Sequence, residues 1–285
     1  MNMPGFEEIA EQVWRRKGEG PKLAVVGSIH GDEEAGAAVI RELLRGDDRV
    51  WRRAGNVDLT LAIGNPRALE EGSRYSKGGR DLNRIFEADD VDTRDYEGAR
   101  AQLLKSALAH SDVLLDLHQT ACTTPPVAVV KDTPTHLRLA AALGVAHAVV
   151  GIETVYKGTM VSRWLDAQGG LGLTVETGQK GREEARAAAY EVVRRFLTAG
   201  AASSAQGGRI RRYRLREAWL SPADGLSFAR ALGNTTRIQA GEIVGHTEAG
   251  PLTCEADSVV FLPREGAAPG TPCMLLADDE GVLTV

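Results

Sequence analysis

Short apolar runs alternate with longer amphipathic stretches through the first 200 residues of the chain. The apolar runs predict strands, which we expect at residues 22–28, 57–63, 112–117, 126–130, 146–150 and 171–176. The amphipathic stretches predict helices at residues 6–16, 33–45, 93–109, 134–143 and 181–199. Alternation of this kind is typical of an α/β fold, with a mostly parallel twisted sheet flanked by helices on both faces.

The helical pattern fades after residue 200. Residues 200–208 are small or polar, a composition that indicates a linker. Beyond them, short alternating runs at 210–219, 242–246 and 258–262 are separated by Gly and Pro, which predicts strands and turns. We therefore expect two domains, a larger α/β domain over residues 1–200 and a small C-terminal β module over residues 209–285.

Composition narrows the class of protein. The chain has 285 residues and a net charge of −5, so a nucleic-acid partner is not expected on electrostatic grounds. It contains no apolar stretch near the roughly 20 residues needed to span a membrane, and no apolar signal core. Three cysteines without C-x-x-C spacing favour a reduced, cytoplasmic location. The sequence leaves open whether the chain forms a homo-oligomer.

Two of the predicted strands are followed by metal-ligating residue types. His30 and Glu33 come directly after the apolar run at 22–28, and His118 ends the run that starts at Asp112. Open α/β sheets place their ligands at the carboxyl ends of the strands, so these three side chains are expected at one edge. Histidine and glutamate are the zinc ligands of hydrolytic sites, which use three protein ligands. A single histidine at a strand end is more often a structural residue.

Other polar residues near the same edge are candidates for catalysis and substrate binding. Arg74, Asn83 and Arg84 lie in a Gly-rich segment, and an arginine can hold a carboxylate with two hydrogen bonds. Glu176 ends the apolar run at 171–176, where a glutamate beside a metal is the expected general base. Taken alone, the arginines also fit a solvated loop and Glu176 also fits a strand end.

Six motifs occur together in a recognisable order. They are His30-x-x-Glu33, Asn65-Pro-Arg-Ala, Arg74-Tyr75, Asp81-Leu-Asn-Arg84-Ile-Phe, Asp116-Leu-His118 and Val175-Glu176-Thr-Gly. In this order the chain resembles the succinylglutamate desuccinylase/aspartoacylase family, which belongs to a wider zinc carboxypeptidase-like group. The resemblance covers residues 22–180 and implies that residues 1–200 form a zinc hydrolase catalytic domain of that fold.

The resemblance also implies an activity, the hydrolysis of the amide bond of a small anionic N-acyl amino acid with one Zn²⁺ per chain. The implied metal ligands are His30, Glu33 and His118. The implied catalytic residues are Glu176 as the base that activates water and Arg74 as the group that polarises the amide carbonyl, a role for which Arg80 competes. The implied substrate-binding residues are Asn83 and Arg84 for the α-carboxylate and Arg163 for a further carboxylate.

The sequence departs from the family pattern in ways that leave the substrate open. Asp32 stands where the family usually has Asn, and the loop that follows Arg74 contains the additional residues 76–80. The tyrosine that aspartoacylase has near its C-terminus has no counterpart here, so N-acetylaspartate is not singled out. Two other functions use the same residues: a metallocarboxypeptidase acting on a peptide C-terminus, and a non-catalytic, metal-dependent binding protein.

Overall fold

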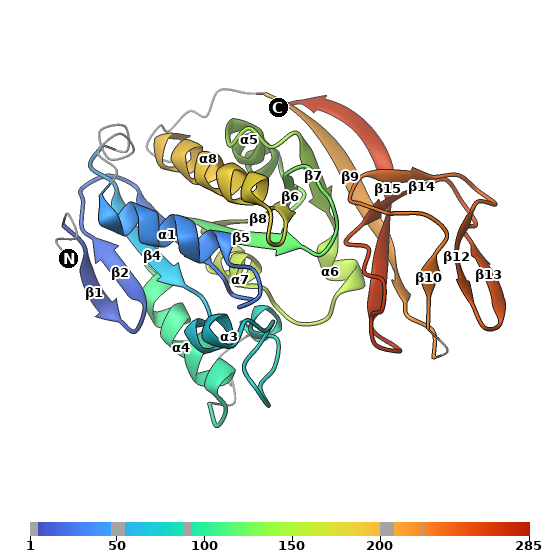
Figure 1. Ribbon diagram of the computed structural model, residues 1–285. Helices are drawn as coiled ribbons and strands as arrows, with labels where there is room; N and C mark the ends of the chain where they lie inside the picture. The colour runs from blue at the N-terminus through green and yellow to red at the C-terminus, as the bar shows by residue number, and fades with distance from the viewer. Residues whose placement is uncertain (1–4, 47–54, 88–92, 200–207, 224) are drawn as a thin grey trace.

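A sheet of 12 strands runs through the computed structural model, which describes residues 5–46, 55–87, 93–199, 208–223 and 225–285 (Figure 1). Its strands up to residue 199 are β1 (Glu7–Ala10), β2 (Val13–Arg16), β3 (Lys22–Gly27), β4 (Asp58–Ile63), β5 (Val113–Thr120), β6 (Val127–Val129), β7 (His147–Val150) and β8 (Leu171–Gln179). The later strands are β9 (Arg209–Leu220), β10 (Ser227–Phe228), β11 (Thr236–Ile238), β12 (Ile243–Thr247), β13 (Gly250–Thr253), β14 (Ser258–Phe261) and β15 (Pro272–Thr284).

The centre of the sheet is parallel and its flanks are antiparallel. The strand order is β1-β2-β4-β3-β5-β8-β6-β7-β9-β15-β14-β11. From β4 to β9 neighbouring strands are parallel, with β6 against β8 as the exception. The predicted α/β class with a mostly parallel central sheet is therefore confirmed. The three strands β3, β5 and β8 lie side by side, so their carboxyl ends share one edge of the sheet.

Helices cover both faces of the central strands (Figure 1). They are α1 (Ala35–Arg45), α3 (Pro66–Glu71), α4 (Tyr96–Leu108), α5 (Pro134–Ala142), α6 (Ile152–Val155), α7 (Val161–Ala167), α8 (Glu183–Ala199) and a short 3₁₀ helix, η1 (Leu82–Arg84). Alternate residues of β3 point to opposite faces. Leu23 and Val25 join one core with α1, α5 and α8, whereas Ala24 and Val26 join a second core with α4 and α7.

The predicted helix at residues 6–16 is wrong, because this segment forms the hairpin of β1 and β2. Phe6, Ile9, Val13 and Trp14 are spaced as in an amphipathic helix. Pairing with the sheet decides the outcome, since β2 pairs antiparallel with β4 and buries Val13 and Trp14. Gln12 adopts a left-handed conformation (φ 54°) that closes the turn between the two strands.

The strands after residue 208 form what we call the C-terminal β region (residues 209–285). Its first strand, β9, pairs parallel with β7, so β9, β15, β14 and β11 extend the main sheet. Strands β10, β12 and β13 form a separate small sheet beside it. Most of the expected linker, residues 200–207, lies outside the described residues, and the division into two domains stays a prediction. Within the described ranges, no helix is long and apolar enough to cross a membrane.

Candidate metal centre and active site

Three strand ends bring the predicted metal ligands and Glu176 to one place. His30 and Glu33 lie in the turn between β3 and α1, and His118 pairs across the sheet with Glu176 of β8. Glycines allow the close packing of this turn. A Cβ atom on Gly31 would lie 2.0 Å from the carbonyl carbon of Ala68 in α3. The tight turn therefore depends on a residue without a side chain.

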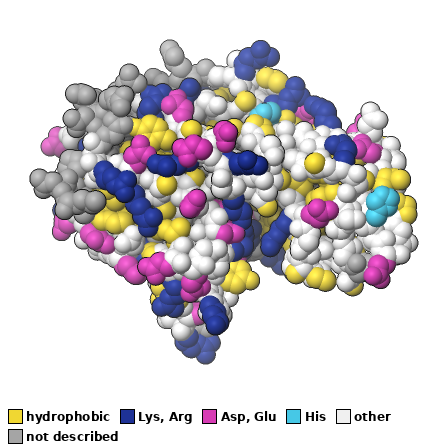
Figure 2. Space-filling view, in the orientation of Figure 1, with side chains coloured by type: hydrophobic (Ala, Val, Ile, Leu, Met, Phe, Trp, Pro, Cys, Tyr) yellow, Lys and Arg dark blue, Asp and Glu magenta, His cyan; other side chains and the backbone are white. Residues whose placement is uncertain are grey.

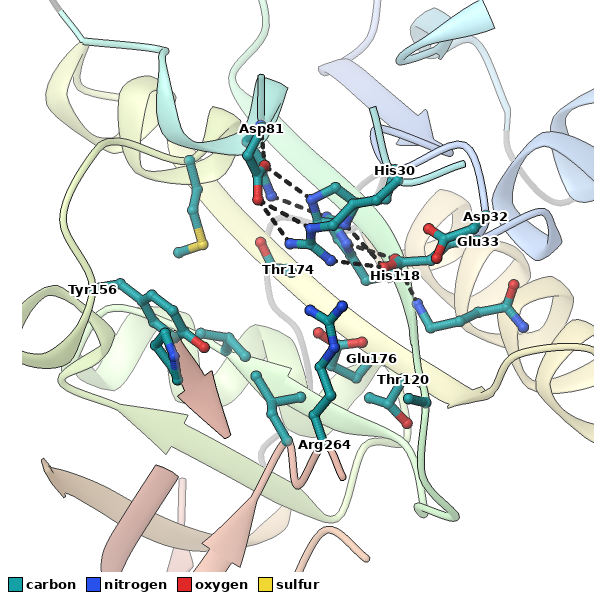
Figure 3. Close-up of a pocket in the computed structure, with 18 of the residues that line it drawn as sticks. His30, Asp32, Glu33, Asp81, His118, Thr120, Tyr156, Thr174, Glu176 and Arg264 are labelled. Atoms are coloured by element: carbon teal, nitrogen blue, oxygen red, sulfur yellow. Dashed lines mark hydrogen bonds and ion pairs between the residues drawn. The ribbon is translucent and has the colours of Figure 1, made fainter. Parts of the chain in front are cut away.

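His30, Glu33 and His118 converge on a common point in the interior. Their candidate ligand atoms all lie within 4.8 Å of one another, and the three residues are 4%, 3% and 4% exposed. His30 Nδ1 lies 2.9 Å from Glu33 Oε1, and His118 Nδ1 lies 2.8 Å from Glu33 Oε2. The same nitrogen of each imidazole thus faces the same carboxylate (Figure 3).

The other ring nitrogen of each histidine faces a second carboxylate. His30 Nε2 lies 3.0 Å from Asp81 Oδ1, and His118 Nε2 lies 2.9 Å from Asp116 Oδ2. If each neutral imidazole donates its Nε2–H to that carboxylate, both Nδ1 lone pairs point toward Glu33. Three acceptors then converge on one point, and a cation is the partner that satisfies all of them. Carboxylates placed behind metal-binding histidines orient such ligands in zinc sites. The residues present therefore fit a zinc ion.

Arg74 and Asp81 form an ion pair at the rim of this triad. Arg74 Nη2 lies 2.8 Å from Asp81 Oδ2, and Arg74 Nη1 lies 3.7 Å from Glu33 Oε1. Burial by itself would raise the pKa of Asp81, but the hydrogen bond from His30 and the charge of Arg74 hold it well below its usual range. Asp81 therefore stays charged and holds both the imidazole and the guanidinium.

Glu176 has the surroundings of a general base. Its side chain points into the cavity (Figure 3), and the residue is 9% exposed. Its Oε2 atom is buried and has no hydrogen-bond partner among the described residues. Burial raises the pKa of Glu176 to about 7. A carboxylate that can take up a proton near neutral pH, with one oxygen free, is suited to accept a proton from water.

The triad and Glu176 open into a cavity of about 320 Å³. One part of its wall is apolar, formed by Val129, Ile152, Met160, Leu262, Pro263 and Pro272. The rest is charged, and it includes an ion pair between Lys180 and Asp32 with 2.5 Å between Nζ and Oδ2. A small molecule with both apolar and charged groups fits such a wall. Asp32 is thus paired with Lys180, the residue that directly follows β8.

Asn83 and Arg84 both line the cavity but differ in their contacts. The Asn83 amide lies 3.1 Å from His118 Nε2 and 3.3 Å from Asp116 Oδ2, and its oxygen accepts from Val161 N. These contacts hold Asn83 beside the triad. The Arg84 guanidinium stacks on the Tyr156 ring, 4.6 Å from its centroid, and donates to the Asn83 carbonyl oxygen. It forms no ion pair with a carboxylate in the described part of the chain.

Two predicted residues do not line this cavity. Arg80 pairs with Asp95, with 2.8 Å between Nε and Oδ2, so of the two candidates for the carbonyl role only Arg74 lies beside the triad. Arg163 lines a neighbouring cavity of about 310 Å³, where its Nη1 lies 3.1 Å from Asp166 Oδ2. The two cavities share a wall that includes Arg84 and Tyr156.

Several residues of the site were not assigned a role from the sequence. Asp116 was within reach of sequence reasoning, because residues two apart on a strand point to the same side and it precedes His118 by two. Tyr156, Lys180 and Arg264 had no such signal. Arg264 lies 88 residues after Glu176 along the chain, and only the tertiary fold brings both to one cavity.

Comparison with known proteins identifies the family. Residues 19–199 match the family model described as the succinylglutamate desuccinylase/aspartoacylase catalytic domain. This chain belongs to that family. The resemblance found in the sequence is thereby confirmed. The matched residues include the triad, Arg74 and Glu176, whereas the C-terminal β region lies beyond them.

Individual members of the succinylglutamate desuccinylase/aspartoacylase family are distant in sequence. A probable aspartoacylase from Trichodesmium erythraeum is 27% identical over 166 residues, which is 55% of each chain. The chain thus spans about half the length of that relative. Two crystal structures share its fold. That of murine aminoacylase 3 has a TM-score of 0.75 and 19% sequence identity, and the match covers 93% of this chain and 97% of that one. That of the succinylglutamate desuccinylase from Chromobacterium violaceum has a TM-score of 0.74 and 17% sequence identity, and the match covers 97% of this chain and 92% of that one.

Proposed function

We propose that this protein is a zinc-dependent deacylase that hydrolyses the amide bond of a small N-acyl amino acid. One observation supports the proposal above all. The two Nδ1 atoms and the Glu33 carboxylate converge in the same cavity in which Glu176 has a buried oxygen that no described residue contacts by a hydrogen bond. A cation site next to a base of raised pKa is suited to the metal-assisted attack of water on an unactivated amide.

His30, Glu33 and His118 would hold the zinc ion. When bound, zinc supplies a Lewis acid that polarises a carbonyl and makes water more acidic. Asp81 and Asp116 keep the proton of each imidazole on Nε2, so that Nδ1 stays free to bind. Glu33 is in addition fixed by the Gln119 backbone N–H, which donates to Oε2 at 2.9 Å.

Glu176 acts as the general base and then as the general acid. Its carboxylate accepts a proton from the attacking water, and the protonated acid gives this proton to the departing amine nitrogen. The two roles need a group that gains and loses a proton near neutral pH, which burial provides for Glu176. Because Glu176 lies on β8 next to His118 of β5, the base is at a fixed distance from the metal centre.

Arg74 and Arg84 would bind two different groups of the substrate, the amide oxygen and the α-carboxylate. Arg74 lies beside Glu33 and, in this proposal, donates to the amide oxygen as negative charge develops on it. Groups of this kind contribute roughly 3–4 kcal/mol each in other enzymes. Arg84 binds the α-carboxylate, because its guanidinium lines the cavity and is held by Tyr156 and the Asn83 carbonyl. Asn83 donates to Asp116 through its side chain and accepts from Arg84 through its backbone carbonyl, so it supports both residues from behind.

The names of the relatives agree with this proposal without fixing the substrate. They include probable aspartoacylases and N-acyl-aromatic-L-amino acid amidohydrolases, which differ in the group that they recognise. The experiment is therefore a panel of N-acetyl, N-succinyl and N-formyl amino acids incubated with the zinc-loaded protein. Release of free amino acid is the expected result. Cleavage of a blocked dipeptide with no turnover of the panel would favour a carboxypeptidase instead. Turnover of neither would contradict the proposal that the protein is a hydrolytic enzyme.

A further inference from the structure

The loop of residues 74–81 begins and ends beside the triad. Its first residue, Arg74, and its last, Asp81, form the ion pair described above, with 2.8 Å between Nη2 and Oδ2. Asp81 also contacts His30, and it caps η1 by accepting from the Asn83 backbone N–H at 3.0 Å. The Asp81 end of the loop is therefore held both by the triad and by η1.

The Arg74 end of the loop has less support from its surroundings. The Arg74 side chain is 32% exposed, and it lines a cavity between the main body and the C-terminal β region, where Figure 2 shows the surface to be hollowed. Its backbone oxygen accepts from the Gly31 N–H at 3.3 Å, which is a long hydrogen bond. A long, partly exposed side chain has many rotamers, so the place of its guanidinium depends on how firmly its backbone is held.

Glu97 is a buried carboxylate that joins the loop to two helices. It lies in the first turn of α4 and is fully buried. Its Oε1 atom accepts from the Ser76 backbone N–H at 2.8 Å and from the Asn65 side-chain amide at 3.1 Å. Ser76 follows Arg74 by two residues, and Asn65 caps α3 by accepting from Ala68 N. One oxygen atom therefore connects α4, α3 and the loop.

Residues 76–80, the additional residues of this chain, pack against the same carboxylate. A Cβ atom on Gly79 would lie 2.1 Å from Glu97 Oε2, so this approach requires a residue without a side chain. The Lys77 backbone N–H donates to Glu71 Oε2 at 2.8 Å, which ties the middle of the loop to the end of α3. The additional residues thus follow a path that carboxylates of α3 and α4 define.

Glu97 is a charged acceptor rather than a neutral one. Burial by itself would raise the pKa of Glu97, but hydrogen bonds from Ser76 and Asn65 hold it below its ordinary value. A buried charge is costly unless donors satisfy it, and hydrogen bonds to an ionised acceptor are roughly twice as strong as neutral ones. Glu97 does not line the cavity, so its carboxylate acts on the loop and not on a substrate.

We propose that Glu97 is a positioning residue that acts on the reaction through Arg74. By holding Ser76, it fixes the backbone from which the Arg74 side chain extends, while Asp81 holds the guanidinium at the other end. The guanidinium is then pre-organised for the negative charge that develops on the amide oxygen. This inference rests on the proposed function and adds to it a residue that lies outside the cavity.

The kinetics of Glu97→Ala test the proposal. A misplacement of about 1 Å can cost about 100-fold, so kcat should fall about 10- to 100-fold. Because Arg74 would act on charge that develops only in the transition state, KM and the zinc content should change less than about threefold. Glu97→Gln keeps an acceptor oxygen for Ser76 and should lose less activity than Glu97→Ala. If Glu97→Ala does not fold, Glu97→Gln takes its place in each measurement.

Asp58→Asn is the matched control. Asp58 is also a buried carboxylate, and it accepts two hydrogen bonds from Arg15 at 2.8 and 2.7 Å, but it lies on β4 outside the cavity. Its replacement should lower the free energy of unfolding and leave kcat unchanged. A loss of kcat in Asp58→Asn equal to that in Glu97→Ala would show that any buried defect lowers the rate, and it would overturn the proposal.

A double-mutant cycle with Arg74→Ala separates positioning from a general loss of structure. If Glu97 acts through Arg74, adding Glu97→Ala to Arg74→Ala should lower kcat by less than about threefold more, because coupled residues are not additive. Losses that multiply in the double variant, or an unchanged kcat in the folded Glu97→Ala protein, would overturn the proposal.

Amide hydrogen exchange tests the position of the loop without turnover. If the normal protein hydrolyses no N-acyl amino acid, the proposed function fails, and exchange in the zinc-loaded protein still tests Glu97. Residues 74–80 should exchange at least about tenfold faster in Glu97→Gln, because the loop opens locally, whereas β5 should keep its protection. Unchanged exchange in the loop, or equal acceleration in the loop and β5, would contradict a positioning role.

Discussion

His118 and Asp116 lie two residues apart on β5, and the imidazole Nε2 of the first is 2.9 Å from a carboxylate oxygen of the second. Asp116 is fully buried, and the same oxygen is also within 3.3 Å of Asn83 Nδ2 and Thr174 Oγ1. If Nε2 donates to this carboxylate, Nδ1 of His118 is left with a lone pair that can bind a metal ion. In the proposed function, Asp116 therefore selects the tautomer in which His118 would bind zinc.

Asp116→Asn should weaken zinc binding about 10- to 100-fold, the usual effect of losing a carboxylate behind a ligating histidine. The amide can donate to Nε2, which would place the ring proton on Nδ1 and block the metal. Competition with a chelator measures the affinity. Asp278→Asn is the control, because Asp278 pairs with Arg216 in the C-terminal β region and does not line the cavity. An unchanged zinc affinity in Asp116→Asn would show that Asp116 does not support zinc binding by His118.

Glu176→Gln should keep the fold and the bound metal but lose activity. Glutamine has nearly the same shape and cannot accept a proton from water, and base catalysis is typically worth about 10²- to 10⁴-fold. Turnover and zinc content are measured on the same sample. A variant with most of its kcat intact would show that another group is the base.

The acid limb of kcat/KM should reflect Glu176. Burial raises the pKa of this group to about 7, and a bound cation would favour the charged form and lower it. The base works only when deprotonated, so the rate should fall as the pH is lowered. The midpoint of the fall should lie between pH 7 and the ordinary glutamate value of about 4.3. A rate that stays constant down to pH 4 would contradict this assignment.

Asp166 should contribute to stability rather than catalysis. It accepts from the Gly172 backbone N–H and lies 2.8 Å from His136 Nε2, and both side chains of the pair are 6% exposed. Breaking a buried pair of this kind costs about 3–5 kcal/mol in other proteins, so Asp166→Asn should lower the free energy of unfolding by an amount of that order. Chemical denaturation measures the change.

The pH dependence of the same contribution has a definite sign. Burial by itself would raise the pKa of Asp166, but the hydrogen bonds from His136 and Gly172 lower it below its usual value. Because the pKa of Asp166 is lower in the folded than in the unfolded protein, its charged carboxylate stabilises the fold at pH values above the unfolded pKa of about 3.9. This stability is lost as the pH falls below that value. The difference in unfolding free energy between the normal protein and Asp166→Asn should therefore shrink below pH 4. A difference that grows on acidification would contradict the pairing.

The sequence predicted the core of the fold and the convergence of His30, Glu33 and His118 because both depend on local signals. Apolar runs marked β3, β5 and β8, and parallel strands must end at a common edge, so His30 and His118 could be expected there. The hairpin at residues 7–16 was missed because pairing with β4 overrode a helical spacing of apolar residues. Arg264 could not be found, because its approach to the cavity depends on β9 joining β7 and on the contacts of Asn234.

Removal and return of zinc test the central claim most directly. The protein is stripped with a chelator, and hydrolysis of an N-acyl amino acid from the active panel is followed while zinc is added back. We expect no turnover without metal and a rate that rises linearly until one zinc per chain is present, with no such rise in His118→Ala. Full activity in the stripped protein, or a rate that does not depend on added zinc, would contradict a metal-dependent deacylase.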